Sequence, residues 1–222
     1  MLYPYTLADL AWTSLALASA SAAFMALDIA TGRRQPMRIM EIVWPVTGLY
    51  MGPLGVVFYL WFGRARRSGA TGSLPPFWQS VFLSASHCGG GCTLGDILSE
   101  GTLYFVGGRI AGSALLASYV GDFSAAYLLG IWFQYLPIRA ARSIAPQAAV
   151  VAAVKADTLS LAAFEAGLFA WMALVQRVWF TPGLKADEPV FWFMMQIGMS
   201  VGFLTTYPAN HWLVRHGIKK GM

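Results

Sequence analysis

Long apolar runs, rather than alternating or helically striped patterns, dominate the chain. A helix needs about 20 consecutive apolar residues to cross the hydrocarbon core of a bilayer. Runs of this kind predict six membrane-spanning helices, at residues 7–27, 39–63, 77–106, 111–138, 157–180 and 189–213. We therefore expect an all-α fold, a polytopic transmembrane helix bundle of about six spans that forms a single integral membrane domain over residues 1–222.

The composition supports a membrane protein and argues against a soluble one. Hydrophobic residues make up 57% of the chain and charged residues only 11%, whereas a soluble domain carries about 25% charged residues. The net charge of +5 comes from short basic clusters between the apolar runs, which is the pattern of cations that flank membrane spans. The lipid bilayer is thus the expected partner, and the basic clusters predict no nucleic-acid partner.

Basic residues also bear on orientation, because cytoplasmic loops carry an excess of lysine and arginine. With six full spans, nine basic residues lie inside and six outside, and the N-terminus is inside. If the proline-broken segment 39–63 re-enters instead of crossing, the count becomes twelve against three, with the N-terminus outside. The length of the segment favours a full span. Both arrangements predict a cytoplasmic C-terminus.

Three adjacent glycines, Gly89–Gly91, interrupt the third predicted span. A glycine in a helix costs about 1 kcal/mol relative to alanine, so the helix that begins near Phe77 is expected to end at these residues. Thr93 and Asp96 have the spacing of a capping box, which starts a new helix. The pattern predicts a third span that is broken at Gly89–Gly91, inside the membrane.

His87, Cys88 and Cys92 lie at this predicted break. Imidazole and thiolate are ligands of copper and zinc, and thiolate especially suits cuprous ion. The three residues predict a site for a copper or zinc ion, to which we add Asp96 and Asp157 as expected metal-site residues. Asp96 would orient a ligand or relay protons. The alternative is structural, since a buried cysteine often behaves as a small hydrophobe.

Acidic residues within the predicted spans also favour a functional site inside the bundle. Ionisable groups inside a bilayer are costly and usually face the bundle interior or a wet path. Five carboxyl groups fall within the predicted spans, namely Asp96, Glu100, Asp122, Asp157 and Glu165. For Asp157 the alternative is an interfacial residue that pairs with Lys155.

These residues favour a protein that binds a soft metal ion, copper or zinc, and transports it across the membrane. A second hypothesis is a membrane thiol–disulfide redox protein in which Cys88 and Cys92 cycle between dithiol and disulfide. A third is a non-catalytic subunit that packs through GxxxG faces against itself, as a homo-oligomer, or against another membrane protein. The sequence has no HExxH motif and no phosphate-binding loop, so an enzyme is the less expected class.

Four motifs together resemble a bacterial integral membrane family that is classed only as a domain of unknown function. The motifs are His87-Cys88-Gly-Gly-Gly-Cys92-Thr-Leu-Gly-Asp96, Lys155-Ala-Asp157-Thr-Leu-Ser-Leu, Phe191-Trp-Phe-Met-Met-Gln196 and Thr205-Thr-Tyr-Pro-Ala-Asn210. The resemblance extends from Trp44 to the C-terminus. It implies a compact multi-span protein of the bacterial inner membrane, and it supplies no activity.

Overall fold

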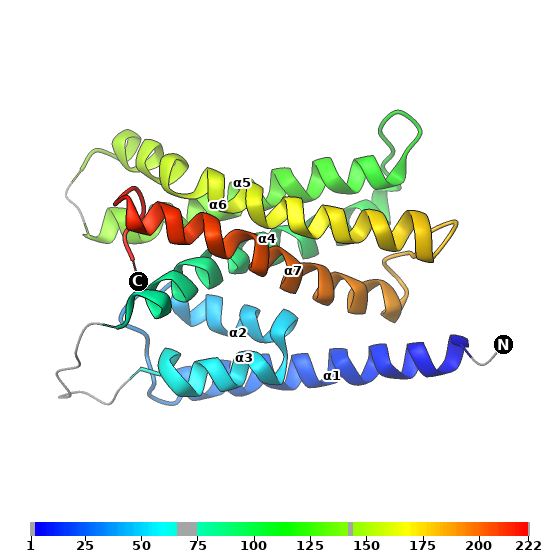
Figure 1. The fold of residues 1–222 in the computed structure, drawn as a ribbon, viewed down its shortest axis with the longest axis horizontal. Coiled ribbons are helices and arrows are strands. Elements are labelled where there is room, and N and C mark those ends of the chain that lie inside the picture. The colour runs from blue at the N-terminus through cyan, green and yellow to red at the C-terminus, as the bar shows by residue number, and fades with distance from the viewer. Residues whose placement is uncertain (1–2, 66–74, 142–143, 222) are drawn as a thin grey trace.

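The computed structural model describes residues 3–65, 75–141 and 144–221, and most of these residues are helical. The longer helices run along a common direction (Figure 1). Two short π-helical segments, η1 and η2, continue α3 and α6. The elements are α1 (Tyr3–Ala30), α2 (Met40–Met51), α3 (Pro53–Phe58), η1 (Tyr59–Gly63), α4 (Phe77–Val106), α5 (Ala114–Ala141), α6 (Pro146–Leu174), η2 (Val175–Trp179) and α7 (Pro189–Arg215).

Four helices of the described chain are long and apolar enough to cross a membrane: α1, α5, α6 together with η2, and α7. This finding indicates an integral membrane protein of the all-α class. The predicted spans 77–106, 111–138 and 189–213 match α4, α5 and α7 to within a few residues, whereas the helix predicted at 157–180 already begins at Pro146.

The α4 helix lies among the other helices and packs against α2, α5, α6 and α7. More than half of its 30 residues are buried. Polar side chains at membrane depth are tolerated where neighbouring helices shield them from lipid. This enclosure explains why α4 is long enough to span a bilayer but is less apolar than α1, α5, α6 and α7.

Residues 39–63 form a helical hairpin instead of one long helix, so the full second span expected there is not confirmed. The α2 and α3 helices lie side by side and antiparallel (Figure 1). Trp44 near the start of α2 packs edge-on against Tyr59 just after α3, with ring centroids 5.4 Å apart. Asp28 at the end of α1 accepts hydrogen bonds from both Tyr59 and Arg64. The chain therefore leaves the bundle at the same end at which it entered.

The tip of this hairpin explains how an apolar run of spanning length can turn back. Gly52 adopts a positive φ of 55°, which glycine reaches at little steric cost. Pro53 then occupies the start of α3, where its missing N–H has no helical partner to lose. The sequence shows that Pro45 and Pro53 interrupt this segment. The length of the apolar run, however, suggested one crossing and gave no sign that the chain reverses its direction.

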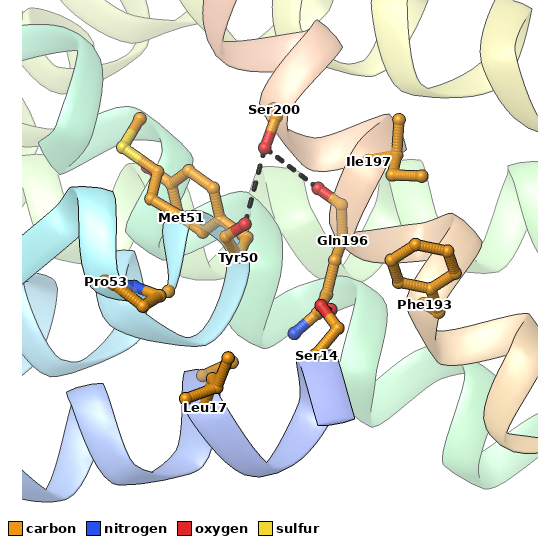
Figure 2. A pocket seen from close by; sticks show the side chains of 11 residues that line it. Ser14, Leu17, Tyr50, Met51, Pro53, Phe193, Gln196, Ile197 and Ser200 are labelled. Atoms are coloured by element: carbon orange, nitrogen blue, oxygen red, sulfur yellow. Dashed lines mark hydrogen bonds between the residues drawn. The ribbon is translucent and has the colours of Figure 1, made fainter. Parts of the chain in front are cut away.

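Two side chains of α7, Gln196 and Ser200, donate hydrogen bonds to the backbone at the hairpin tip, and Figure 2 shows the one from Ser200 to Tyr50. Gln196 donates to the Leu49 carbonyl at 2.7 Å and Ser200 donates to the Tyr50 carbonyl at 3.4 Å. Ser14 of α1 donates to the Gln196 side chain at 2.9 Å. Backbone groups freed at membrane depth need such partners, because hydrocarbon offers none.

The α4 helix is continuous through Gly89–Gly91, so the predicted break in the third span is wrong. A Cβ added at these three glycines would lie 3.1, 3.2 and 3.0 Å from Phe164, Val43 and Gly130, respectively. The glycines therefore let α6, α2 and α5 approach the α4 backbone closely. The close packing offsets the low helix propensity of glycine, and Thr93 lies inside the helix instead of capping a new one.

The two ends of the bundle differ in charge. Helices α1, α5 and α7 end, and α4 and α6 begin, at one end (Figure 1), which we name the basic end. The described basic residues nearest to this end are Arg33, Arg34, Arg38, Arg64, Arg139, Lys155, Arg215, Lys219 and Lys220. The opposite end carries Arg109, Arg177 and Lys185. Arg66, Arg67 and Arg142 lie outside the described residues.

Candidate functional site

A row of buried polar and thiol side chains follows α4 through the bundle. It begins at Ser84 near the basic end and ends at Glu100, which corresponds to about 24 Å at 1.5 Å per residue. The hydrocarbon core of a bilayer is about 30 Å thick, so the row covers most of that depth. We name it the polar file. Its members are Ser84, Ser86, His87, Cys88, Cys92, Thr93, Asp96, Ser99 and Glu100.

Near the basic end, the polar file meets a fully buried ion pair. The Lys219 ammonium lies 2.8 Å from Asp157 Oδ1, and neither side chain is exposed. The same ammonium donates to Asn210 Oδ1 at 3.0 Å and to the Ser84 carbonyl at 3.4 Å. Lysine has three N–H donors and no acceptor, so these three oxygens satisfy it completely.

Two hydroxyl side chains hold Asn210 in this position. The Asn210 amide nitrogen donates to Ser160 Oγ at 2.6 Å and to Thr206 Oγ1 at 3.0 Å. Thr206 Oγ1 in turn donates to the Ser160 carbonyl at 2.6 Å. The network fixes the amide with its nitrogen toward the hydroxyls and its oxygen toward the ammonium, which joins α6 to α7.

His87 lies near this ion pair. It interacts electrostatically with Lys219 and Asp157, and its ring lies 6.2 Å from the ring of Phe133 on α5. Neither ring nitrogen has a hydrogen-bond partner among the described residues, and the same holds for Asp157 Oδ2. One oxygen of the Asp157 carboxylate therefore pairs with the Lys219 ammonium, and the other has no hydrogen-bond partner among the described residues.

The two cysteines form the middle of the polar file. Cys88 and Cys92 are fully buried, free, and close enough for their side chains to interact. The Tyr50 hydroxyl from α2 interacts with both thiols. Glu165 from α6 lies beside Cys92, although no hydrogen bond of ordinary geometry joins Glu165 to any described residue.

Beyond the thiols, four carboxyl groups gather from three helices. Asp96 interacts with Glu165, Asp122 and Glu100, and the carboxyl groups of Asp122 and Glu100 are adjacent. All four side chains are buried. The ion pairs of the described residues involve other carboxylates, so no described lysine or arginine pairs with any of the four. Their negative charges are therefore not balanced by the protein's own described cations.

The structure divides the predicted metal-site residues into separate groups. His87 and Asp157 lie with Lys219. Cys88 and Cys92 lie with Glu165. Asp96 belongs to the set of four carboxyl side chains beyond the thiols. Within the described part of the chain, no three histidine, cysteine or acidic side chains are grouped to hold a metal ion. One reason is the unbroken helix, since adjacent residues of an α-helix point about 100° apart. Binding of copper or zinc stays a prediction.

Sequence reasoning missed several important members of this site. Lys219 follows a span and resembles its exposed neighbour Lys220, so the sequence indicates only another cation that flanks a span. Asp157 pairs with Lys219 and not with Lys155, whose side chain is exposed. A buried carboxylate signals that a cation must be near it, but the sequence does not reveal which one. Tyr50 carried no signal beyond its residue type, and Asn210 was singled out only as the last residue of a family motif, without a role.

The search of curated proteins and the search of solved structures each gave no match. The family described as "Domain of unknown function (DUF4396)" matches residues 77–219, which hold the polar file, its partners on α5, α6 and α7, and Lys219. The match covers more than half of the chain but not the segment 44–76, to which the resemblance was expected to extend. The chain belongs to the DUF4396 family of proteins with a domain of unknown function.

Proposed function

We propose that the protein conducts protons across the membrane through the polar file. The observation that supports this proposal is the group of four buried carboxyls, Asp96, Glu100, Asp122 and Glu165, without a described basic partner. Two like charges 4 Å apart repel by about 4 kcal/mol at an effective dielectric constant of 20. The four groups therefore cannot all be ionised, and they must hold protons or another cation.

Protons suit this arrangement better than an ion that needs a closed coordination shell. A proton moves between neighbouring groups that each accept and release it, and such groups mark proton relays in membrane proteins. Along α4 these groups follow one another from His87 and Asp157, past the two thiols and Tyr50, to the four carboxyls. We assign the four carboxyl side chains together as the place where this path stores protons.

We further propose that the basic end faces the cytoplasm. Nine described basic residues lie nearest to that end and three lie at the other, and lysine and arginine accumulate on the cytoplasmic side of membrane proteins. This orientation puts the start of α1 outside and the residues after α7 inside. In a bacterium the membrane concerned would be the inner one, across which a proton gradient acts.

Flux in reconstituted vesicles tests the proposal. Liposomes that contain the purified protein and a pH-sensitive dye receive a potassium diffusion potential with valinomycin. We expect a change in internal pH that reverses when the potential is reversed and that scales with the amount of protein. Liposomes that stay as proton-tight as protein-free ones under potentials of both signs would contradict the proposal.

A soft metal ion is the second candidate cargo, because the thiols of Cys88 and Cys92 lie close together and the Glu165 carboxyl lies beside Cys92. Two thiolates suit cuprous ion, whereas zinc usually has four ligands, and the described residues hold no ready-made group of three. His87 lies near the ion pair and is not part of this donor set. Copper or zinc retained by the purified protein should therefore be lost in a Cys88→Ser, Cys92→Ser variant and kept in His87→Ala. Equal metal content in all three proteins would exclude this donor set.

A further inference from the structure

The surroundings of Lys219 have the composition of a cation-binding site. Three oxygens of three kinds converge on the ammonium: a carboxylate oxygen of Asp157, an amide oxygen of Asn210 and the carbonyl of Ser84. One further buried oxygen of the site, Asp157 Oδ2, has no hydrogen-bond partner among the described residues. The site therefore offers more oxygen donors than one ammonium uses.

The distances indicate the size of the cation that fits. The ammonium nitrogen lies 2.8, 3.0 and 3.4 Å from the three oxygens. Calcium binds oxygen at about 2.3–2.6 Å and magnesium at about 2.0–2.1 Å, so the cage is too wide for either ion without rearrangement. A larger monovalent ion, such as ammonium or potassium, matches these distances.

The segment that carries Lys219 follows α7 directly and is hydrogen-bonded to the last turn of that helix. After α7 the chain turns at Gly217, which has a φ of 68°, and the N–H groups of Ile218 and Lys219 both donate to the Leu213 carbonyl. A cavity of about 280 Å³ lies beside this segment. Its walls include Ala156, the neighbour of Asp157 in sequence, and Gln134 of α5. Ile218 and Lys220, the sequence neighbours of Lys219, also line this cavity.

We propose that Asp157, Asn210 and the Ser84 carbonyl form a binding site for a monovalent cation of the size of ammonium or potassium, and that Lys219 occupies it as a tethered cation. A free cation and the lysine ammonium exclude each other from this site. The inference goes beyond proton conduction, because it names a second kind of ion and depends only on the oxygens around Lys219.

Replacement of the tethered cation by a free one tests this inference. Lys219→Ala removes the ammonium and leaves space, so ammonium or methylammonium chloride should raise its unfolding temperature saturably, by about 5 °C, relative to N-methylglucamine chloride of equal ionic strength. Wild-type protein and Lys220→Ala, which changes an exposed neighbour, should show no difference between the salts. Lys219→Met fills the space with an uncharged side chain and should not respond.

A second experiment tests whether the free cation needs the Asp157 carboxylate. Adding Asp157→Asn to Lys219→Ala should abolish the response to ammonium. If Lys219→Ala does not survive purification in ordinary buffer, the yield of folded, monodisperse protein purified throughout in ammonium chloride replaces the unfolding temperature as the readout, and it should exceed the yield in N-methylglucamine chloride. Equal unfolding temperatures, or equal yields, in the two salts would overturn the inference. Neither readout involves proton flux, so this outcome is separate from a failure of the proposed function.

Discussion

Lys219 and Asp157 are 62 residues apart in the sequence, yet Lys219 Nζ lies 2.8 Å from Asp157 Oδ1. Both side chains are fully buried. The pair joins the segment after α7 to the middle of α6, and it places the protein's own cation at one end of the polar file. A buried ion pair of this kind is strongly coupled, because each partner without the other is an uncompensated charge.

The coupling predicts a specific pattern of stabilities. Lys219→Met should lower the free energy of unfolding by about 3–5 kcal/mol, because it leaves the Asp157 carboxylate buried without its partner. The double variant Lys219→Met, Asp157→Asn should recover most of the loss, since it removes both charges. Thermal unfolding in detergent measures the effect, and Lys220→Met serves as the control on an exposed lysine. Equal stability of the single and double variants would show that the two charges are not coupled.

The glycines of α4 should differ sharply in their tolerance of a side chain. A Cβ at Gly95 would lie 2.4 Å from the Ala126 backbone nitrogen, whereas a Cβ at Gly101 would meet nothing within 4 Å. Gly95→Ala should therefore push α5 away from α4 and lower the unfolding temperature. Gly101→Ala should leave it unchanged or raise it, because alanine favours a helix by about 1 kcal/mol over glycine. Similar melting of the two variants would argue against the close α4–α5 packing.

The helical hairpin at residues 39–63 predicts which residues lie on the same side of the membrane. Single cysteines introduced at Arg34 and Lys220 should be labelled by a membrane-impermeant thiol reagent from one side of the membrane, and a cysteine at Asp187 from the other. The native Cys88 and Cys92 are fully buried, so they should contribute little background. If residues 39–63 crossed the membrane completely, Arg34→Cys and Lys220→Cys would be labelled from opposite sides.

The thiol pair should resist oxidation while α4 remains helical. Side chains four residues apart on a helix have Cβ atoms about 5–6 Å apart, whereas a disulfide needs about 3.5–4.5 Å. We expect Cys88 and Cys92 to stay reduced under mild oxidation, as measured by alkylation and mass spectrometry of the protein after denaturation. A reversible disulfide would instead support the thiol–disulfide redox hypothesis.

The sequence predicted the class of the protein well because bilayer thickness dictates the length of apolar runs. The range 77–106 coincides with α4, and the five acidic residues expected in the spans are all buried. The reversal at Gly52 was missed because an apolar run of about 25 residues fits one crossing or two half-crossings equally well. Gly89–Gly91 were misread because the cost of glycine in an isolated helix ignores the close packing that glycine permits.

The functional site was predicted only in part, because a sequence shows positions along each helix and not the contacts between helices. Spacing along a chain shows which side chains share a helix, and it correctly placed Cys88 and Cys92 together. It does not show which helices face each other, so neither the separation of His87 from the thiols nor the pairing of Asp157 with Lys219 was visible. Long-range contacts of this kind depend on the packing of α4 against α5, α6 and the segment after α7.

Proton flux in variants of the four carboxyls tests the central claim most directly. In liposomes under a potassium diffusion potential, Asp96→Asn and Glu165→Gln should each lower the potential-driven flux per protein by about tenfold or more, because each removes a group that takes up and releases protons. Asp187→Asn, which neutralises an exposed carboxylate outside the bundle, should leave the flux unchanged. Wild-type flux that persists undiminished in both buried variants, with all proteins folded and equally incorporated, would contradict the assignment of the polar file as a proton path.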